Sequence, residues 1–125
     1  MRTILLITPR QPIAQILTQR LRDAPFIRFV HEPDYSRFDS GLSSYGADTA
    51  LIEAQESGEY GIAYCLSLCD RLRIETPGCR VLLLCPEQDA AGVSAAINAK
   101  RAGRIDDFLF CDATTDYLTS KLLAV

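Results

Sequence analysis

The sequence predicts an α/β domain in which a parallel sheet of five strands is covered by helices on both faces. Five short, almost continuously apolar runs alternate along the chain with segments whose apolar residues recur every three or four positions. Apolar runs without polar alternation are typical of strands buried on both faces, as in parallel sheets. With 125 residues, the chain fits a single domain, residues 1–125, that is large enough to bury a core.

The predicted strands begin and end at turn or helix-cap signals. They span residues 3–8, 26–30, 49–54, 80–85 and 105–111. His31 comes after the second strand, and we expect it to be a surface or loop residue. Strands that alternate with helices predict a parallel sheet with right-handed crossovers.

The predicted helices span residues 12–23, 62–76 and 89–102, and a last helix begins at Thr114 or Thr115. Residues 35–46 form either a short helix or an irregular segment. Gly103 is expected to end the third of these helices in a left-handed conformation. The predicted inward faces are Ile13, Ile16, Leu17 and Leu21; Cys65, Leu66, Cys69 and Leu72; Val93, Ala96 and Ile97; and Leu118, Leu122 and Leu123.

Composition excludes several classes of protein. The net charge is −3 and the arginines are scattered, so direct binding of nucleic acid is not expected. No apolar run approaches the roughly 20 residues that span a membrane, and the first residues lack a signal peptide. Five cysteines, an odd number, predict reduced thiols and a cytoplasmic protein.

Motifs for nucleotide binding and for hydrolysis are missing. The segment after the first strand, Thr8 to Pro12, contains no glycine that could cradle a phosphate. His31 is the only histidine, and no nucleophile-elbow pattern accompanies it. We therefore expect no enzyme, no catalytic residues, no cofactor and no metal site.

The strand at 49–54 delivers a carboxylate, Glu53, to its carboxyl end, where open α/β sheets build their sites. Ser57-Gly58 and Gly61 follow it. This spacing resembles the phosphoacceptor strand and loop of receiver domains of two-component response regulators, in which an aspartate holds the position of Glu53. The resemblance covers essentially the whole chain. It implies a CheY-like, flavodoxin-like three-layer fold with strand order 2-1-3-4-5.

The resemblance also assigns the pocket around Glu53, and most of its chemical groups are replaced. The two acids that hold Mg²⁺ in a receiver are Thr8 and Pro9 here. The hydroxyl residue that ends the fourth strand is Cys85, and the lysine that ends the fifth is Cys111. These replacements predict a degenerate receiver, a pseudo-receiver that is not phosphorylated.

Two further positions of the fifth strand are compared with the family. The proline that follows the lysine is Asp112 here, whereas the switch aromatic is kept as Phe108. Glu53 itself has two interpretations. It imitates a phosphorylated aspartate, or it is a strand-end carboxylate that is solvated or paired with Arg10, and we favour the second.

The cysteines leave a separate alternative open. Cys85 and Cys111 should end neighbouring strands at the same edge, and Cys65 and Cys69 share one helix face. They could form a thiol-based redox or metal sensor. Because buried cysteine is a common small apolar residue and no Cys-x-x-Cys spacing occurs, we favour a packing role.

The resemblance implies signalling by protein contact. Receivers use the face of the fourth helix, fifth strand and fifth helix for partners and dimers, which here is 93–102, Phe108 and 115–123. The expected partners are an effector protein or a second copy of the chain. An alternative is the regulatory domain of a longer transcription regulator with a separate DNA-binding domain.

Overall fold

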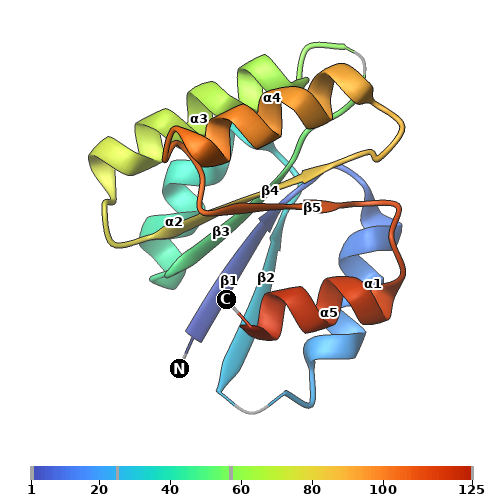
Figure 1. The fold of residues 1–125 in the computed structure, drawn as a ribbon. Coiled ribbons are helices and arrows are strands. Elements are labelled where there is room, and N and C mark those ends of the chain that lie inside the picture. The colour runs from blue at the N-terminus through green and yellow to red at the C-terminus, as the bar shows by residue number, and fades with distance from the viewer. Residues whose placement is uncertain (1, 25, 57, 125) are drawn as a thin grey trace.

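Five parallel strands pair side by side in the order β2-β1-β3-β4-β5, as the sequence predicts (Figure 1). The computed structural model describes residues 2–24, 26–56 and 58–124. The strands are β1 (Arg2–Ile7), β2 (Ile27–Glu32), β3 (Thr49–Glu53), β4 (Arg80–Cys85) and β5 (Asp107–Phe110). The predicted bounds of β4 are confirmed, and those of β1 and β3 differ by one residue.

Helices cover both faces of this sheet, as Figure 1 shows. They are α1 (Gln11–Leu21), α2 (Phe38–Tyr45), α3 (Ile62–Glu75), α4 (Ala90–Arg101) and α5 (Thr115–Ala124). Helices α1 and α5 lie on one face, and α2, α3 and α4 lie on the other. A 3-10 helix, η1 (Tyr35–Arg37), leads into α2, so the segment 35–46 is mostly helical.

Alternate strand residues point to opposite faces and build two separate cores. Ile4 and Leu6 of β1 pack with Leu17 of α1 and Leu118 of α5. Leu5 and Ile7 of the same strand pack with the helices of the other face. Because β1 and β3 lie inside the sheet, their apolar residues are completely buried, which explains their continuous apolar sequence.

Two strand predictions need correction. His31 is part of β2 and does not follow it, because β2 pairs with β1 as far as the register Ile7↔Glu32. Strand β5 spans Asp107–Phe110, and is therefore shorter at both ends than the predicted 105–111. The preceding residue, Asp106, uses its side chain to accept the Val81 N–H at 2.7 Å, so regular strand pairing begins after it.

Two helix-face predictions are wrong. Ile16 is 42% exposed, and Leu123 is 49% exposed. In α5 the residues four apart, Leu118 and Leu122, take the buried positions, and Leu123 lies about 100° further round the helix. In α1 the buried residues are Ala14, Leu17 and Leu21.

Other predictions at the helix ends are confirmed. Gly103 has a φ of 76° after α4, the left-handed conformation expected there. The Thr114 hydroxyl accepts the Tyr117 N–H at 3.2 Å and so caps α5. The predicted position of Ser57 lies outside the described residues. No helix in the described part of the chain combines the length and the apolar character needed to cross a membrane.

Candidate functional site

The pocket residues named from the sequence all lie at the carboxyl edge of the sheet. Glu53 and Cys85 are the last residues of β3 and β4. Thr8 and Pro9 follow β1, and Cys111 follows β5. The parallel topology brings these ends together, because every strand of such a sheet runs in the same direction.

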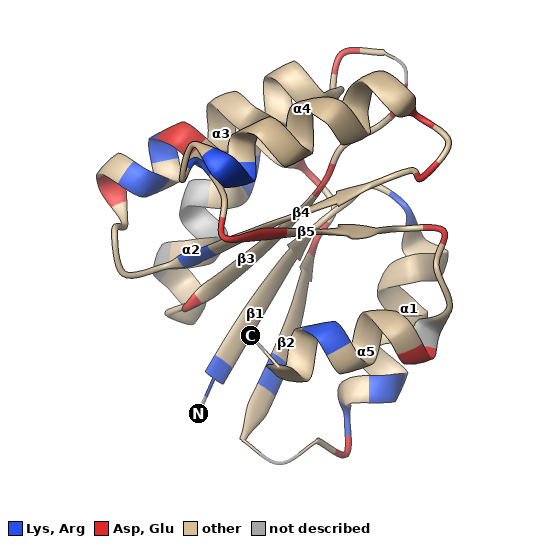
Figure 2. Ribbon diagram, in the orientation of Figure 1, with Lys and Arg blue, Asp and Glu red and all other residues tan. Residues whose placement is uncertain are grey.

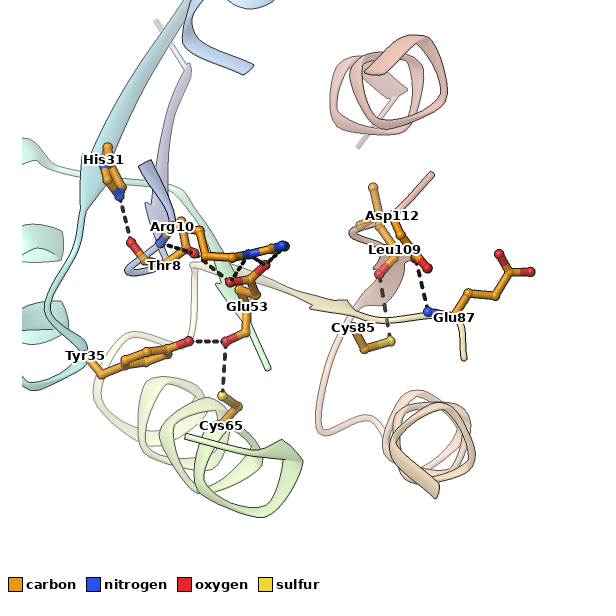
Figure 3. Close-up of polar contacts among 10 residues, drawn as sticks. All are labelled: Thr8, Arg10, His31, Tyr35, Glu53, Cys65, Cys85, Glu87, Leu109 and Asp112. Carbon is orange, nitrogen blue, oxygen red and sulfur yellow. Dashed lines mark hydrogen bonds and ion pairs between the residues drawn. The ribbon is translucent and has the colours of Figure 1, made fainter. Parts of the chain in front are cut away.

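Glu53 is 2% exposed, yet each of its carboxylate oxygens has a donor (Figure 3). The Thr8 hydroxyl donates to Oε1 at 2.7 Å. The Arg10 Nε donates to Oε1 at 3.1 Å and to Oε2 at 2.8 Å, and its Nη2 donates to Oε2. The predicted pairing of Glu53 with Arg10 is confirmed. Glu53 is therefore a buried ion-paired carboxylate, not a solvated one.

Arg10 is held by this contact although it lies on the exposed loop between β1 and α1. The Arg10 N–H also donates to the Thr8 hydroxyl oxygen at 3.1 Å. Hydrogen bonding to Glu53 raises the pKa of the Arg10 guanidinium above its usual value. Its side chain is 52% exposed, whereas that of Glu53 is 3% exposed. The pair thus joins a buried anion to a cation that reaches it from the surface.

His31 supports the same loop from β2. Its Nε2 lies 2.7 Å from the Thr8 carbonyl oxygen, which can only accept, so Nε2 donates. His31 is thus a half-buried strand residue, and the expectation of a surface or loop residue is wrong. The sequence hides this contact because it depends on the register that brings β2 beside β1.

Tyr35 is a pocket residue that the sequence did not reveal. It is 2% exposed and its hydroxyl donates to the backbone oxygen of Glu53, while the Cys65 thiol lies 3.5 Å from the same oxygen. The Tyr35 ring stacks on Tyr60 with centroids 4.4 Å apart and meets the edge of Tyr64 at 6.0 Å. This cluster fixes the end of β3. No sequence motif links its three tyrosines, which come from η1, the loop after β3 and α3.

At the ends of β4 and β5, thiols hold the positions where a receiver domain has a hydroxyl group and a lysine ammonium group. The Cys111 N–H donates to the Cys85 carbonyl at 3.0 Å, so these cysteines lie side by side, as predicted, with Cys85 ending β4 and Cys111 directly following β5. Burial raises the pKa of Cys85 to about 11, and burial together with Glu53 raises that of Cys111. Both are free thiols and protonated at neutral pH. They supply neither a cation nor a strong hydrogen-bond donor.

Cys65 and Cys69 are buried in α3, and burial raises the pKa of each to about 12. Like the other cysteines, they are not joined by a disulfide. Within residues 2–24, 26–56 and 58–124, no three His, Cys, Asp or Glu side chains are grouped so that they could hold a metal ion. The cation beside Glu53 is the Arg10 guanidinium.

Phe108 lies half-buried in β5, against the core under α4, with its ring 6.0 Å from that of Phe110 and inclined by 71°. Next to it, Asp107 faces two ammonium groups. The Lys100 Nζ of α4 is 3.0 Å from one carboxylate oxygen, and the Lys121 Nζ of α5 is 3.8 Å from the other. Asp107 therefore links α4 to α5 across β5.

Comparison with solved structures places this architecture in one class: the chain has the fold of response-regulator receiver domains. A response regulator from Thermotoga maritima superposes with a TM-score of 0.78, at 16% identity over 99% of this chain and 96% of its own. The BeF3-activated receiver domain of Klebsiella pneumoniae RstA gives 0.76 at 18% identity, over 98% and 97%.

A third similar structure is RcsB from Salmonella enterica serovar Typhimurium, bound to the promoter rprA in the presence of phosphomimetic BeF3-. It gives a TM-score of 0.77 at 14% identity and matches 98% of this chain and 67% of its own. Neither a protein-family model nor a curated protein sequence matches the chain. At these identities the structural likeness establishes the fold.

Proposed function

We propose that this chain is a receiver-like signalling domain that acts through protein contacts, without phosphorylation of its acceptor position and without enzymatic activity. The observation that carries the proposal is the Arg10 guanidinium bound by two nitrogens to the buried Glu53 carboxylate. The carboxylate at the position that would accept a phosphoryl group is therefore already occupied by an ion pair with Arg10.

Physical chemistry supports this proposal. Transfer of a phosphoryl group to a carboxylate depends on cations that neutralise charge on the transferring oxygens. Thr8 and Pro9 cannot hold Mg²⁺, and Cys111 cannot supply an ammonium group. Arg10 supplies a positive charge, but its guanidinium pairs with the Glu53 carboxylate. This pairing makes the carboxylate less available as a nucleophile. Conversely, a glutamate neutralised in this way does not imitate an activated, doubly charged acceptor.

The first prediction is that the protein does not accept a phosphoryl group. Incubation with acetyl phosphate and Mg²⁺ should leave the intact mass unchanged for wild type and for Glu53→Asp. The matched positive variant combines Glu53→Asp with Thr8→Asp, Pro9→Asp and Cys111→Lys, and should begin to react. A beryllofluoride adduct of the wild type, observed by fluorine NMR with Mg²⁺ present, would overturn the proposal.

The proposed contact surface comprises α4, β5 and α5 (residues 93–102, Phe108 and 115–123), facing either an effector protein or a second copy. A symmetric dimer is the simplest arrangement. We expect sedimentation to show dimers at high micromolar concentration, and Lys121→Glu to weaken them by breaking the Asp107 bridge. Arg22→Glu, on the exposed end of α1, is the control. A monomer at all concentrations would contradict this surface as a dimer interface.

A longer transcription regulator is the second candidate. It is favoured by the likeness to RcsB, which is bound to a promoter and of which this chain matches 67%. On this view α4, β5 and α5 would contact a DNA-binding domain in the same polypeptide. Sequencing the complete reading frame tests it: a helix-turn-helix sequence in the same frame supports it, and a stop codon directly after Val125 contradicts it.

A further inference from the structure

Strand β2 forms an open edge of the sheet. It pairs with β1 along its whole length and with no other strand of the described residues. At the two ends of this pairing, the carbonyls of Phe26 and Glu32 accept N–H groups from the β1 side. Because a parallel ladder uses alternate residues, the even-numbered residues of β2 face β1. The backbone N–H and C=O groups of Ile27, Phe29 and His31 therefore face away from the sheet.

An edge of this kind can accept a strand from another chain, and β2 has few features that prevent it. The strand is six residues long and contains no proline, glycine or lysine. Apart from the exposed Arg28, its residues are half-buried. Ile27 and Phe29 pack on the face covered by α1, and Val30 packs on the opposite face, so both faces anchor the strand. Pro33, the next residue, has no N–H and ends the possible ladder.

The charged side chains of β2 are arranged so that the strand is complementary to itself. Arg28 and Glu32 are four residues apart, so they point to the same face of the sheet, on either side of Val30. The basic position near the start of β2 is blue in Figure 2. When two β2 strands run antiparallel and are centred on Val30, Arg28 of each copy lies opposite Glu32 of the other. Opposite charges at such positions stabilise a strand pair.

The same register satisfies the backbone. Phe29 lies opposite His31 of the second copy, and because both residues face outward, they can exchange two hydrogen bonds on each side of the centre. A shift by one residue would set outward groups against groups that already bond to β1. A shift by two residues would place a charged side chain opposite Val30. The register centred on Val30 alone pairs both the charges and the backbone groups.

Both charged groups have bonding capacity left for this contact. Arg28 donates through Nη2 to the Tyr45 carbonyl, and its guanidinium lies 5.6 Å from the centre of the Tyr45 ring. These contacts hold the side chain and use one of the five N–H groups of an arginine. Glu32 accepts the Asp34 N–H through Oε2 at 2.9 Å, and Oε1 can accept a bond from an arginine.

We propose that β2 pairs antiparallel with β2 of a second copy of this chain, about a two-fold axis that passes through the sheet at Val30. The two five-stranded sheets then join into one continuous sheet. Self-complementarity selects this occupant, because an interface with two-fold symmetry makes each contact twice. The contact lies at the opposite edge of the sheet from β5. It leaves α4, β5 and α5 free, and it does not rest on the proposed function.

The test uses the intact chain carrying Lys121→Glu, which suppresses association through α4, β5 and α5. We expect sedimentation of this parent chain to show dimers at high micromolar concentration. Amide hydrogen exchange of Phe29 and His31 should slow about tenfold when about nine-tenths of the chain is dimeric, because only the monomer exposes these groups. The amide of Val30, which faces β1, should slow far less and is the internal control.

Charge reversals identify the register. Arg28→Glu and Glu32→Arg, each added to the parent chain, should weaken dimerisation at least about tenfold, because each places like charges opposite each other twice. An equimolar mixture of the two variants should recover the dimer, since the glutamates of one then face the arginines of the other. The matched controls are Arg22→Glu and Glu56→Arg, at exposed positions outside β2. Both should dimerise as the parent does.

Three outcomes would overturn the inference. They are a parent chain that is monomeric at all concentrations, unchanged exchange of Phe29 and His31 in the dimer, and a mixture of the two charge variants that stays monomeric although circular dichroism shows both to be folded. Dimers of the wild type that Lys121→Glu abolishes would refute the β2 contact and support the surface of α4, β5 and α5. Phosphorylation of the wild type would contradict the proposed function and leave the β2 contact unaffected.

Discussion

The carboxyl edge of the sheet has two halves with different side-chain chemistry, the ends of β1 and β3 and the ends of β4 and β5. At the ends of β1 and β3, a buried carboxylate is retained and each of its oxygens is satisfied, by Thr8 and Arg10. At the ends of β4 and β5, the Cys85 thiol lies 3.8 Å from the Leu109 carbonyl oxygen, and the Cys111 backbone N–H donates to the Cys85 carbonyl. The comparison teaches that a buried charge in this pocket has a complete set of partners, whereas the buried position at the end of β4 is occupied by a neutral thiol.

The largest effect on stability should come from removing the Arg10 guanidinium at the ends of β1 and β3. Arg10→Ala leaves the buried Glu53 with only the Thr8 hydroxyl as donor, and should lower the free energy of unfolding by about 2–3 kcal/mol. This is below the usual loss for a fully buried pair because water reaches the Arg10 side. Glu53→Gln should cost about 1 kcal/mol, since the remaining arginine is hydrated.

Urea unfolding of both single variants and the double variant measures this coupling. Arg10→Ala/Glu53→Gln should be more stable than Arg10→Ala alone, because the buried charge is gone. Arg37→Ala, at an exposed arginine outside the pocket, is the control. Equal and additive losses would mean that the pair contributes nothing beyond its two side chains.

Truncation of the two thiols at the ends of β4 and β5 should change stability less than removal of Arg10. Cys85→Ala/Cys111→Ala is expected to lower the free energy of unfolding by about 1 kcal/mol, the low end of small core truncations. Self-association should not change. Stoichiometric zinc in the purified protein, or partner binding that depends on oxidant, would instead favour the thiol-sensor alternative.

The smallest effect concerns pH. The pKa of Cys85 is raised by burial from an ordinary value of 9.0 to about 11. Between these values the unfolded chain loses the thiol proton and the folded chain keeps it, so stability falls as pH rises. The stabilisation is complete below pH 9 and lost towards pH 11. Melting temperatures across this window should decline less steeply in Cys85→Ala, whereas an identical slope would assign the decline to other groups.

The strand pattern and the strand-end residues could be predicted because they depend on local apolar periodicity and on one topological rule. Glu53 and its partner Arg10 were found in this way. The edge strand β2 was harder: one of its edges is unpaired, its residues are mostly half-buried, and it therefore ends in polar residues such as His31.

The remaining pocket contacts could not be predicted because they join segments without local signals. Tyr35 reaches the Glu53 carbonyl across 18 positions of sequence, from a 3-10 helix whose pattern is ambiguous. The exposure of Ile16 was missed for a related reason. An apolar residue at a helical spacing predicts burial, but the neighbouring α5 leaves a hollow there instead of a cover.

The Arg10 contact also has a consequence for how information could pass through the domain. A cation attached to the same polypeptide does not become scarcer on dilution, so Arg10 stays beside Glu53 at any protein concentration. Under the proposed function, the pocket then has a single state, in which Arg10 is paired with Glu53. The amount of complex that such a domain forms with its partner would then depend, by mass action, on the concentrations of the two proteins.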